Sequence, residues 1–189
     1  MGADGTPLGT GDSGAVIAVA AGKYHTVYVL ADGTAMAVGN NDYGQLGDGT
    51  TTDRSTAVVV QAADGTPLGT GDSGAVIAVA AGWGHTIYVL ADGTAMAVGN
   101  NDYGQLGDGT TTQRSTAVVV QAADGTPLGT GDSGAVIAVA AGYFHTVYVL
   151  ADGTAMSVGY NGFGQLGHGT TTPRSPAPAV PPPPARPPA

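Results

Sequence analysis

Residues 16–60 decide the fold, and they read VIAVAAGKYHTVYVLADGTAMAVGNNDYGQLGDGTTTDRSTAVVV. Asp32-Gly33 lies between two apolar runs and fits a two-residue hairpin turn, whose central positions need positive φ. Runs rich in valine, alanine and threonine favour strands, because β-branched side chains pack well on a pleated surface. Four such runs are present, at residues 16–20, 26–30, 34–38 and 57–60.

The same unit occurs three times in the 189 residues. Residues 3–62 and 63–122 differ at four positions, 23/83, 24/84, 27/87 and 53/113, and residues 123–182 follow the template as far as Arg174-Ser175. Repeats of this length indicate propellers, solenoids or arrays, and four strands per repeat is typical of a propeller blade. We therefore predict an all-β chain of β-propeller blades that forms an incomplete ring. A β-solenoid is the alternative, because the repeat period alone does not separate the two.

The predicted domain organisation follows from the repeats. We expect one domain at residues 1–176, with blades at about 3–62, 63–122 and 123–176, and a proline-rich tail at 177–189.

Composition argues against several classes of partner. Charged residues make up 10% of the chain and hydrophobic residues 42%, which is too apolar for a disordered protein. A net charge of −9 with only five lysines and arginines argues against a phosphate-binding surface and against an anionic membrane surface. No apolar run approaches 18 residues. We expect no nucleic-acid partner and no membrane insertion.

Two motifs carry a resemblance to a known family. Residues 19–26 read VAAGKYHT, and residues 39–50 read GNNDYGQLGDGT. Together they resemble the regulator-of-chromosome-condensation repeat, and they recur in the second and third units. The resemblance covers residues 1–176. It implies a β-propeller, typically seven-bladed, that serves as a binding platform, and the founding member of that family promotes guanine-nucleotide exchange on a small GTPase in chromatin.

We expect neither an enzyme nor a cofactor. Residues 9–14 read GTGDSG, which matches a dinucleotide-binding fingerprint, but a strand directly before it and a packing helix after it are missing. The same residues resemble the surroundings of a protease nucleophile, yet no positioned base accompanies Ser13, Ser73 or Ser133. Asp48 and its neighbours lack the spacing of a calcium loop. Turn formation explains all of these residues.

Three equivalent histidines, His25, His85 and His145, are expected to be structural. Each precedes the second strand of its unit, and in a ring the three would diverge and share a metal only if they lined the axis. Neutral imidazole both donates and accepts hydrogen bonds. We therefore predict no metal site and expect each histidine to hold its own blade.

The connection between the first two strands of each unit is a candidate interface. It is the place where the repeats vary most, and such connections lie on the surface. Large aromatic residues in a surface turn are typical of interfaces, with drift in an unconstrained loop as the alternative. The candidate residues here are Lys23, Tyr24, Trp83, Tyr143 and Phe144.

The proline-rich tail is the second candidate interface. Nine of the 12 prolines lie between residues 173 and 188, and a proline run favours polyproline II geometry. Proline cannot donate to a sheet ladder, so the fourth strand of the third unit is weakened. We expect residues 177–189 to lie extended along a neighbouring chain or blade. The candidate residues are Pro178, Val180, Pro181, Pro182, Pro183 and Pro184.

Three blades are too few to close a ring, since propellers usually have four to eight. The end blades would then expose their faces. We expect a self-assembling scaffold or protein-interaction module, in which two copies form a ring or many copies form a head-to-tail filament. The alternative is a fragment of a regulatory propeller that binds a protein partner such as a small GTPase.

Overall fold

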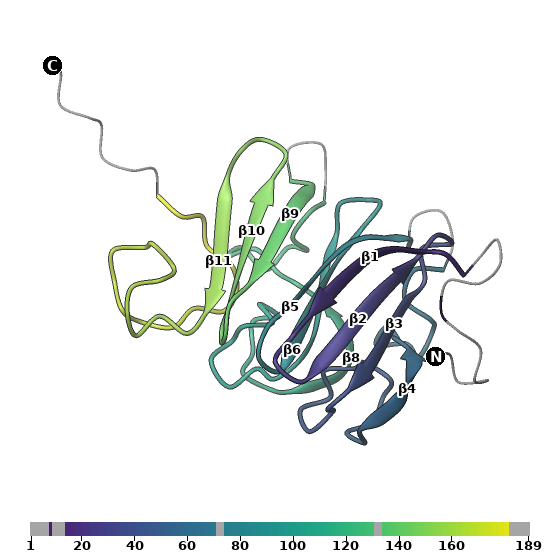
Figure 1. Ribbon diagram of the computed structural model, residues 1–189. Coiled ribbons are helices and arrows are strands. Elements are labelled where there is room, and N and C mark those ends of the chain that lie inside the picture. The colour runs from purple at the N-terminus through teal and green to yellow at the C-terminus, as the bar shows by residue number, and fades with distance from the viewer. Residues whose placement is uncertain (1–7, 9–13, 71–73, 131–133, 182–189) are drawn as a thin grey trace, which may run out of the picture.

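The computed structural model describes residues 8, 14–70, 74–130 and 134–181, and these residues form three antiparallel sheets without a helix (Figure 1). The first sheet has the order β1-β2-β3-β4, the second β5-β6-β7-β8 and the third β9-β10-β11. Each repeat forms its own sheet, which confirms the prediction of propeller blades over a solenoid. The strands are β1 (Val16–Ala21), β2 (His25–Leu30), β3 (Ala35–Gly39), β4 (Arg54–Val59), β5 (Val76–Ala81), β6 (His85–Leu90), β7 (Ala95–Gly99), β8 (Arg114–Val119), β9 (Val136–Ala141), β10 (His145–Leu150) and β11 (Ala155–Gly159).

The hairpin between β2 and β3 lies where it was expected, but its turn is not of the predicted two-residue type. Leu30 N donates to the Thr34 carbonyl, so the loop has three residues, and Asp32 does not have a positive φ. Val29 pairs with Ala35 across it, and Gly33 has a φ of 87°, which only glycine adopts without strain. The fourth strand begins at Arg54, three residues before the predicted start. A register shift between Ala37 and Gly39 lets Arg54 pair with Gly39, and this irregularity is invisible in the hydrophobic pattern.

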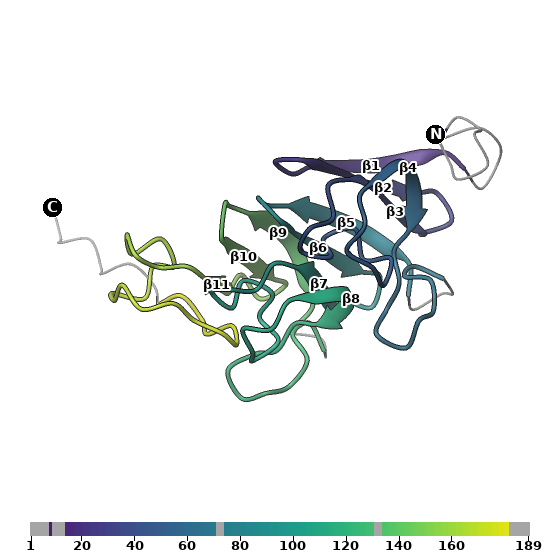
Figure 2. The same cartoon turned by 90° about the horizontal axis from the view of Figure 1, so that it is seen from below.

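The three blades lie side by side in chain order, with the first strand of each blade against the first strand of the next (Figure 2). Buried side chains fill the space between neighbouring blades. Those between the first and second blades include Val27, Val29 and Leu46 on one side and Tyr88 and Val98 on the other. The equivalent residues of the second and third blades form the next cluster. Successive side chains of each strand point to opposite faces of the sheet, so every blade has two apolar faces, one for each neighbour.

The third blade has an irregular outer edge in place of a fourth strand. Arg174 pairs with Gly159, Ala179 pairs with Met156, and the Val180 amide donates to the Ala155 carbonyl at 2.8 Å. Pro176 and Pro178 lack the amide that a continuous ladder needs. Residues 177–180 contact both blades: Ala177 pairs with Ala122 of the second repeat, and Ala179 pairs with Met156 of the third blade. The expected path along a neighbouring blade therefore holds for Ala177, while Ala179 and Val180 lie along their own blade. The remainder of the tail at 182–189 lies outside the described residues.

No helix within the described part of the chain is long and apolar enough to cross a membrane.

Candidate interaction surfaces

A chain of hydrogen bonds joins each blade to the next. His25 Nε2 lies 2.9 Å from Thr86 Oγ1, and the Thr86 hydroxyl donates to the Gln45 carbonyl at 3.0 Å. The hydroxyl proton is thus used on the carbonyl, which leaves Thr86 Oγ1 to accept from a protonated Nε2. His85 makes the same contact with Thr146 at 3.2 Å. The expectation that each histidine holds its own blade is therefore wrong for these two, because the turn before β2 places the ring at the edge that faces the next blade.

Burial keeps these histidines neutral. It lowers the pKa of His25 to about 4, and burial together with the two neighbouring histidines lowers the pKa of His85 to about 3. His145 is only half-buried, and burial lowers its pKa too. Its imidazole has no hydrogen-bond partner among the described residues. The last blade therefore carries an unfinished copy of the contact that joins the other blades.

The first blade has an open face. Tyr28, Met36 and Val38 are half-buried there, whereas the equivalent Tyr88 and Val98 of the second blade are fully buried against the first. In the second and third blades, the same residues pack against the preceding blade.

The third blade has the opposite open face. Val147, Val149 and Ala155 are half-buried, whereas their counterparts Val27 and Val29 are fully buried against the second blade. The two ends of the chain therefore present the two complementary halves of the interface between blades.

The loop after the third strand is held by its own polar side chains. The Asn41 amide donates to Asp48 at 3.2 Å and to the Thr50 carbonyl at 3.1 Å, while Leu46 N donates to the Asn41 oxygen. Burial raises the pKa of Asp48, but hydrogen bonds from Thr50 and Arg54 outweigh it and hold the pKa below its usual value. The Asp48 carboxylate therefore stabilises the loop through hydrogen bonds within it. No group of three metal-ligating side chains occurs among the described residues.

Aromatic side chains gather at the end of the blades where the second strands begin. Trp83 stacks on Tyr143 with ring centroids 5.4 Å apart, and Phe144 lies 5.2 Å from Tyr103. We call this set the aromatic row, and it comprises Tyr24, Tyr43, Trp83, Tyr103, Tyr143, Phe144, Tyr160 and Phe163. The other three aromatic residues of the chain, Tyr28, Tyr88 and Tyr148, lie in strands instead.

The candidate residues of the variable turns meet in this row. Lys23 Nζ lies 4.8 Å from the ring centroid of Tyr24 and donates to the Tyr143 hydroxyl at 3.1 Å, which raises the pKa of Lys23. Sequence reasoning missed the aromatic residues of the longer loops. Each loop carries one at the same place, as Tyr43, Tyr103 or Phe163, and this recurrence was the available signal.

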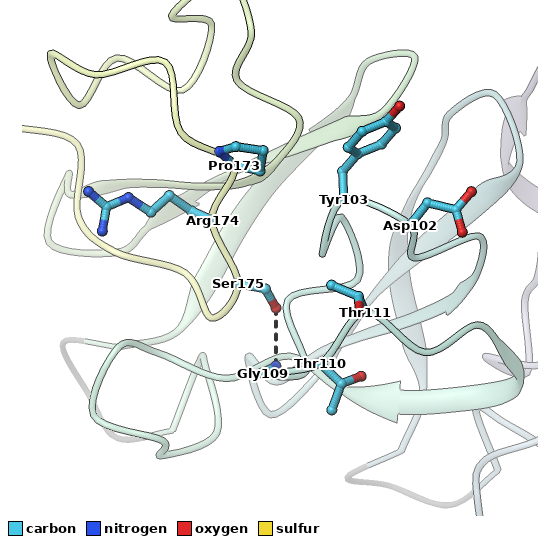
Figure 3. Close-up of a pocket in the computed structure, with 8 residues that line it drawn as sticks. All are labelled: Asp102, Tyr103, Gly109, Thr110, Thr111, Pro173, Arg174 and Ser175. Carbon is cyan, nitrogen blue, oxygen red and sulfur yellow. Dashed lines mark hydrogen bonds between the residues drawn. The ribbon is translucent and has the colours of Figure 1, made fainter.

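Two pockets meet at Tyr103. One, of about 390 Å³, is lined by Asp102, Tyr103, Pro173 and Arg174, and its Ser175 hydroxyl accepts a hydrogen bond from Gly109 N at 3.2 Å (Figure 3). The other, of about 450 Å³, is lined chiefly by aromatic residues: Tyr103, Tyr143, Phe144, Tyr160 and Phe163. A single tyrosine thus connects two hollows on the same surface.

The remaining predicted residues lie apart from the aromatic row. Pro178 and Val180 border β11, and Pro181 is exposed after them. Pro182, Pro183 and Pro184 lie outside the described residues, as do Ser13, Ser73 and Ser133.

Comparison with known proteins gives consistent matches. Two descriptions of the Regulator of chromosome condensation (RCC1) repeat match, one at residues 16–45, 76–105 and 136–165 and the other at residues 32–89 and 92–149. The Ultraviolet-B receptor UVR8 of Arabidopsis thaliana is 32% identical over 151 residues, which cover 80% of this chain and 31% of the receptor. The chain therefore spans less than a third of that relative.

Solved structures agree on the architecture. The crystal structure of human WBSCR16 superposes with a TM-score of 0.71 at 26% identity, over 92% of this chain and 39% of that one. Prp20p from Saccharomyces cerevisiae, described with its binding properties to Gsp1p and histones, superposes with a TM-score of 0.62 at 22% identity, over 87% of this chain and 38% of that one. The second likeness shows the fold alone.

Proposed function

Because the chain belongs to the regulator of chromosome condensation (RCC1) repeat family, we propose that it is a non-catalytic propeller module for protein interaction, with a second copy of itself as its first partner. The observation that carries the proposal is the complementarity of the two open blade faces. The family supports the protein-interaction role.

Head-to-tail association follows from the residues at the two ends. Tyr28, Met36 and Val38 of one copy would pack on Val147 and Val149 of another, as their equivalents pack between blades within the chain. A contact between two different faces either closes a ring or continues as a filament. Two copies supply six blades, which lies within the usual range for a propeller.

The unfinished hydrogen-bond chain supports the same association. His145 and the Gln165 carbonyl stand where His25 and Gln45 hold Thr86. Thr26, the counterpart of Thr86, is half-buried on the open face of the first blade. In a head-to-tail contact, Thr26 of one copy accepts from His145 Nε2 of the other and donates to the Gln165 carbonyl, so that the polar groups fix the register of the apolar faces.

We predict that Met36→Lys abolishes association and leaves the blades folded. The lysine places a charge on the open face. In the monomer this charge stays in water, whereas in the assembly it would be buried without an opposite charge beside it. Light scattering of the wild-type chain at micromolar concentration should give a multiple of 18.3 kDa, and the variant should give a single 18.3 kDa species. Ile17→Lys is the matched control, because Ile17 is 59% exposed and its equivalents Ile77 and Ile137 stay 54% and 61% exposed although their blades are docked on a preceding blade. A wild-type chain that stays monomeric would overturn the proposal.

A second candidate is a part of a regulatory propeller that binds a protein partner such as a small GTPase. The short coverage of the relatives favours it, together with the described binding of Prp20p to Gsp1p. In this case the open faces are covered by further blades of one polypeptide. A purified small GTPase titrated onto the chain, followed by light scattering, should then give a one-to-one complex without self-association.

A further inference from the structure

We propose that the aromatic row is a binding site for polyproline segments, and that residues 181–188 of another copy, PPPPARPP, are its ligand. The inference rests on the proposed self-association in one respect only, namely that the ligand comes from another copy of the chain. The binding site itself stands on the surface described above.

The surface is exposed and apolar where the two pockets meet. Phe163 is 88% exposed and Tyr143 51%, although both are large hydrophobic residues. The larger pocket beneath them holds about 450 Å³, within the range of ligand sites. Exposed apolar surface of this kind marks an interaction site, because an isolated domain gains nothing from leaving it in water.

The chemistry of this surface matches proline. Polyproline segments dock in grooves lined by aromatic rings, and their fixed backbone loses little entropy on binding. Tyrosine hydroxyls at the rim, such as those of Tyr103 and Tyr143, are donors for the ligand carbonyls that a polyproline helix leaves unpaired. The protein already places a proline here, because Pro173 lines the pocket that Tyr103 shares (Figure 3).

Charge complements the apolar match. The segment carries one charged residue, Arg186, in a chain whose net charge is −9. Asp102 is exposed beside Tyr103 and lines the smaller pocket. An arginine next to the prolines can pair with this carboxylate or stack on a neighbouring ring.

The path of the tail points to binding between copies. Arg174 pairs with Gly159, beside the aromatic row, and Val180 pairs with Ala155 at the other end of β11. These two ends of β11 are four residue steps apart, which is roughly 13 Å in an extended strand. Residues 174–180 thus run away from the row of their own copy, which favours the row of another copy as the site for the segment that follows.

Intrinsic fluorescence provides the test, because Trp83 is the only tryptophan and lies in the row. We expect the peptide PPPPARPP, titrated onto the full chain, to change the Trp83 emission with saturation. A peptide with alanine at every proline should bind at least tenfold more weakly, since it loses the preformed helix.

Two variants of the chain complete the test. Phe163→Ala should weaken binding about tenfold, the usual loss for an aromatic anchor, and folding is not at risk at so exposed a site. Ile137→Ala is the matched control, because Ile137 is 61% exposed on β9, away from the row, and should change nothing. Equal binding of the two peptides, or no effect of Phe163→Ala, would overturn the inference.

The Met36→Lys variant separates this inference from the proposed function. Peptide binding that persists in the monomeric variant upholds the polyproline site without reference to the blade contact. Conversely, a chain that associates head to tail but does not distinguish the proline peptide from the alanine peptide keeps the proposed function and loses this inference.

Discussion

Replacing Tyr88 with alanine is expected to lower the free energy of unfolding by about 3–5 kcal/mol, the range for truncating a fully buried aromatic residue. Tyr88 has no exposed surface and packs between the first and second blades with Val27 and Val29. The cavity left behind lies among strands of two sheets, which cannot both move inward without breaking their ladders. Urea denaturation followed by circular dichroism measures the loss.

The repeat supplies a matched control for this experiment. Tyr28 is the same residue at the same place in the first blade, but it is half-buried on the open face. In the Met36→Lys background, which is expected to be monomeric, Tyr28→Ala should cost less than half as much as Tyr88→Ala. Equal losses would mean that the first blade face is covered in the monomer, which contradicts the open face described above.

Acidification is expected to destabilise the chain well above the pH at which carboxylates titrate. The unfolded chain has an ordinary histidine pKa of 6.5, whereas the pKa is about 4 for His25 and about 3 for His85 in the folded chain. Protons therefore bind the unfolded state first as the pH falls. Stability is fully present above pH 6.5 and is lost on the way down to the folded pKa values, by roughly 2 kcal/mol per histidine at about pH 5.

Glutamine variants test the assignment. His25→Gln and His85→Gln keep a side-chain amide that can donate to Thr86 or Thr146 but does not titrate. The difference in unfolding free energy between about pH 7.5 and pH 5 should shrink by roughly half in each single variant. An unchanged pH dependence would show that the buried histidines are not its source.

Local features of the chain were predictable from the sequence, and contacts between repeats were not. The strands and the place of the turn at Asp32-Gly33 follow from residue type and spacing within one unit, whereas the type of turn did not, because only Gly33 has a positive φ. The contact of His25 with Thr86 depends on how one unit sits against the next, which no pattern inside a unit encodes. Pro178 predicted a weakened fourth strand, and only isolated bridges occur there; that these bridges reach both Ala122 and Met156 depends on how the repeats pack.

Only half of the residues in the aromatic row were predicted from the sequence. Trp83 and Phe144 were identified because they lie in the variable turns, where the otherwise constant repeats differ. Tyr43 and Tyr103 are identical in two repeats and lie in a loop rich in turn residues, so the repeat itself concealed them. Their proximity to the turns, with Tyr43 5.0 Å from Trp83, arises only once neighbouring blades are packed.

The near-identity of the two interfaces between blades has a consequence for how many blades assemble. Because the blades are nearly identical, the open face of a first blade fits the open face of any last blade, so this contact does not determine how many blades assemble. The size of a closed assembly is then set by geometry alone, through the angle that each blade makes with the next, and not by the number of repeats encoded in one chain. In the proposed assembly, a chain with one blade more or fewer would form the same contact between copies, and only the number of chains in a closed ring would change.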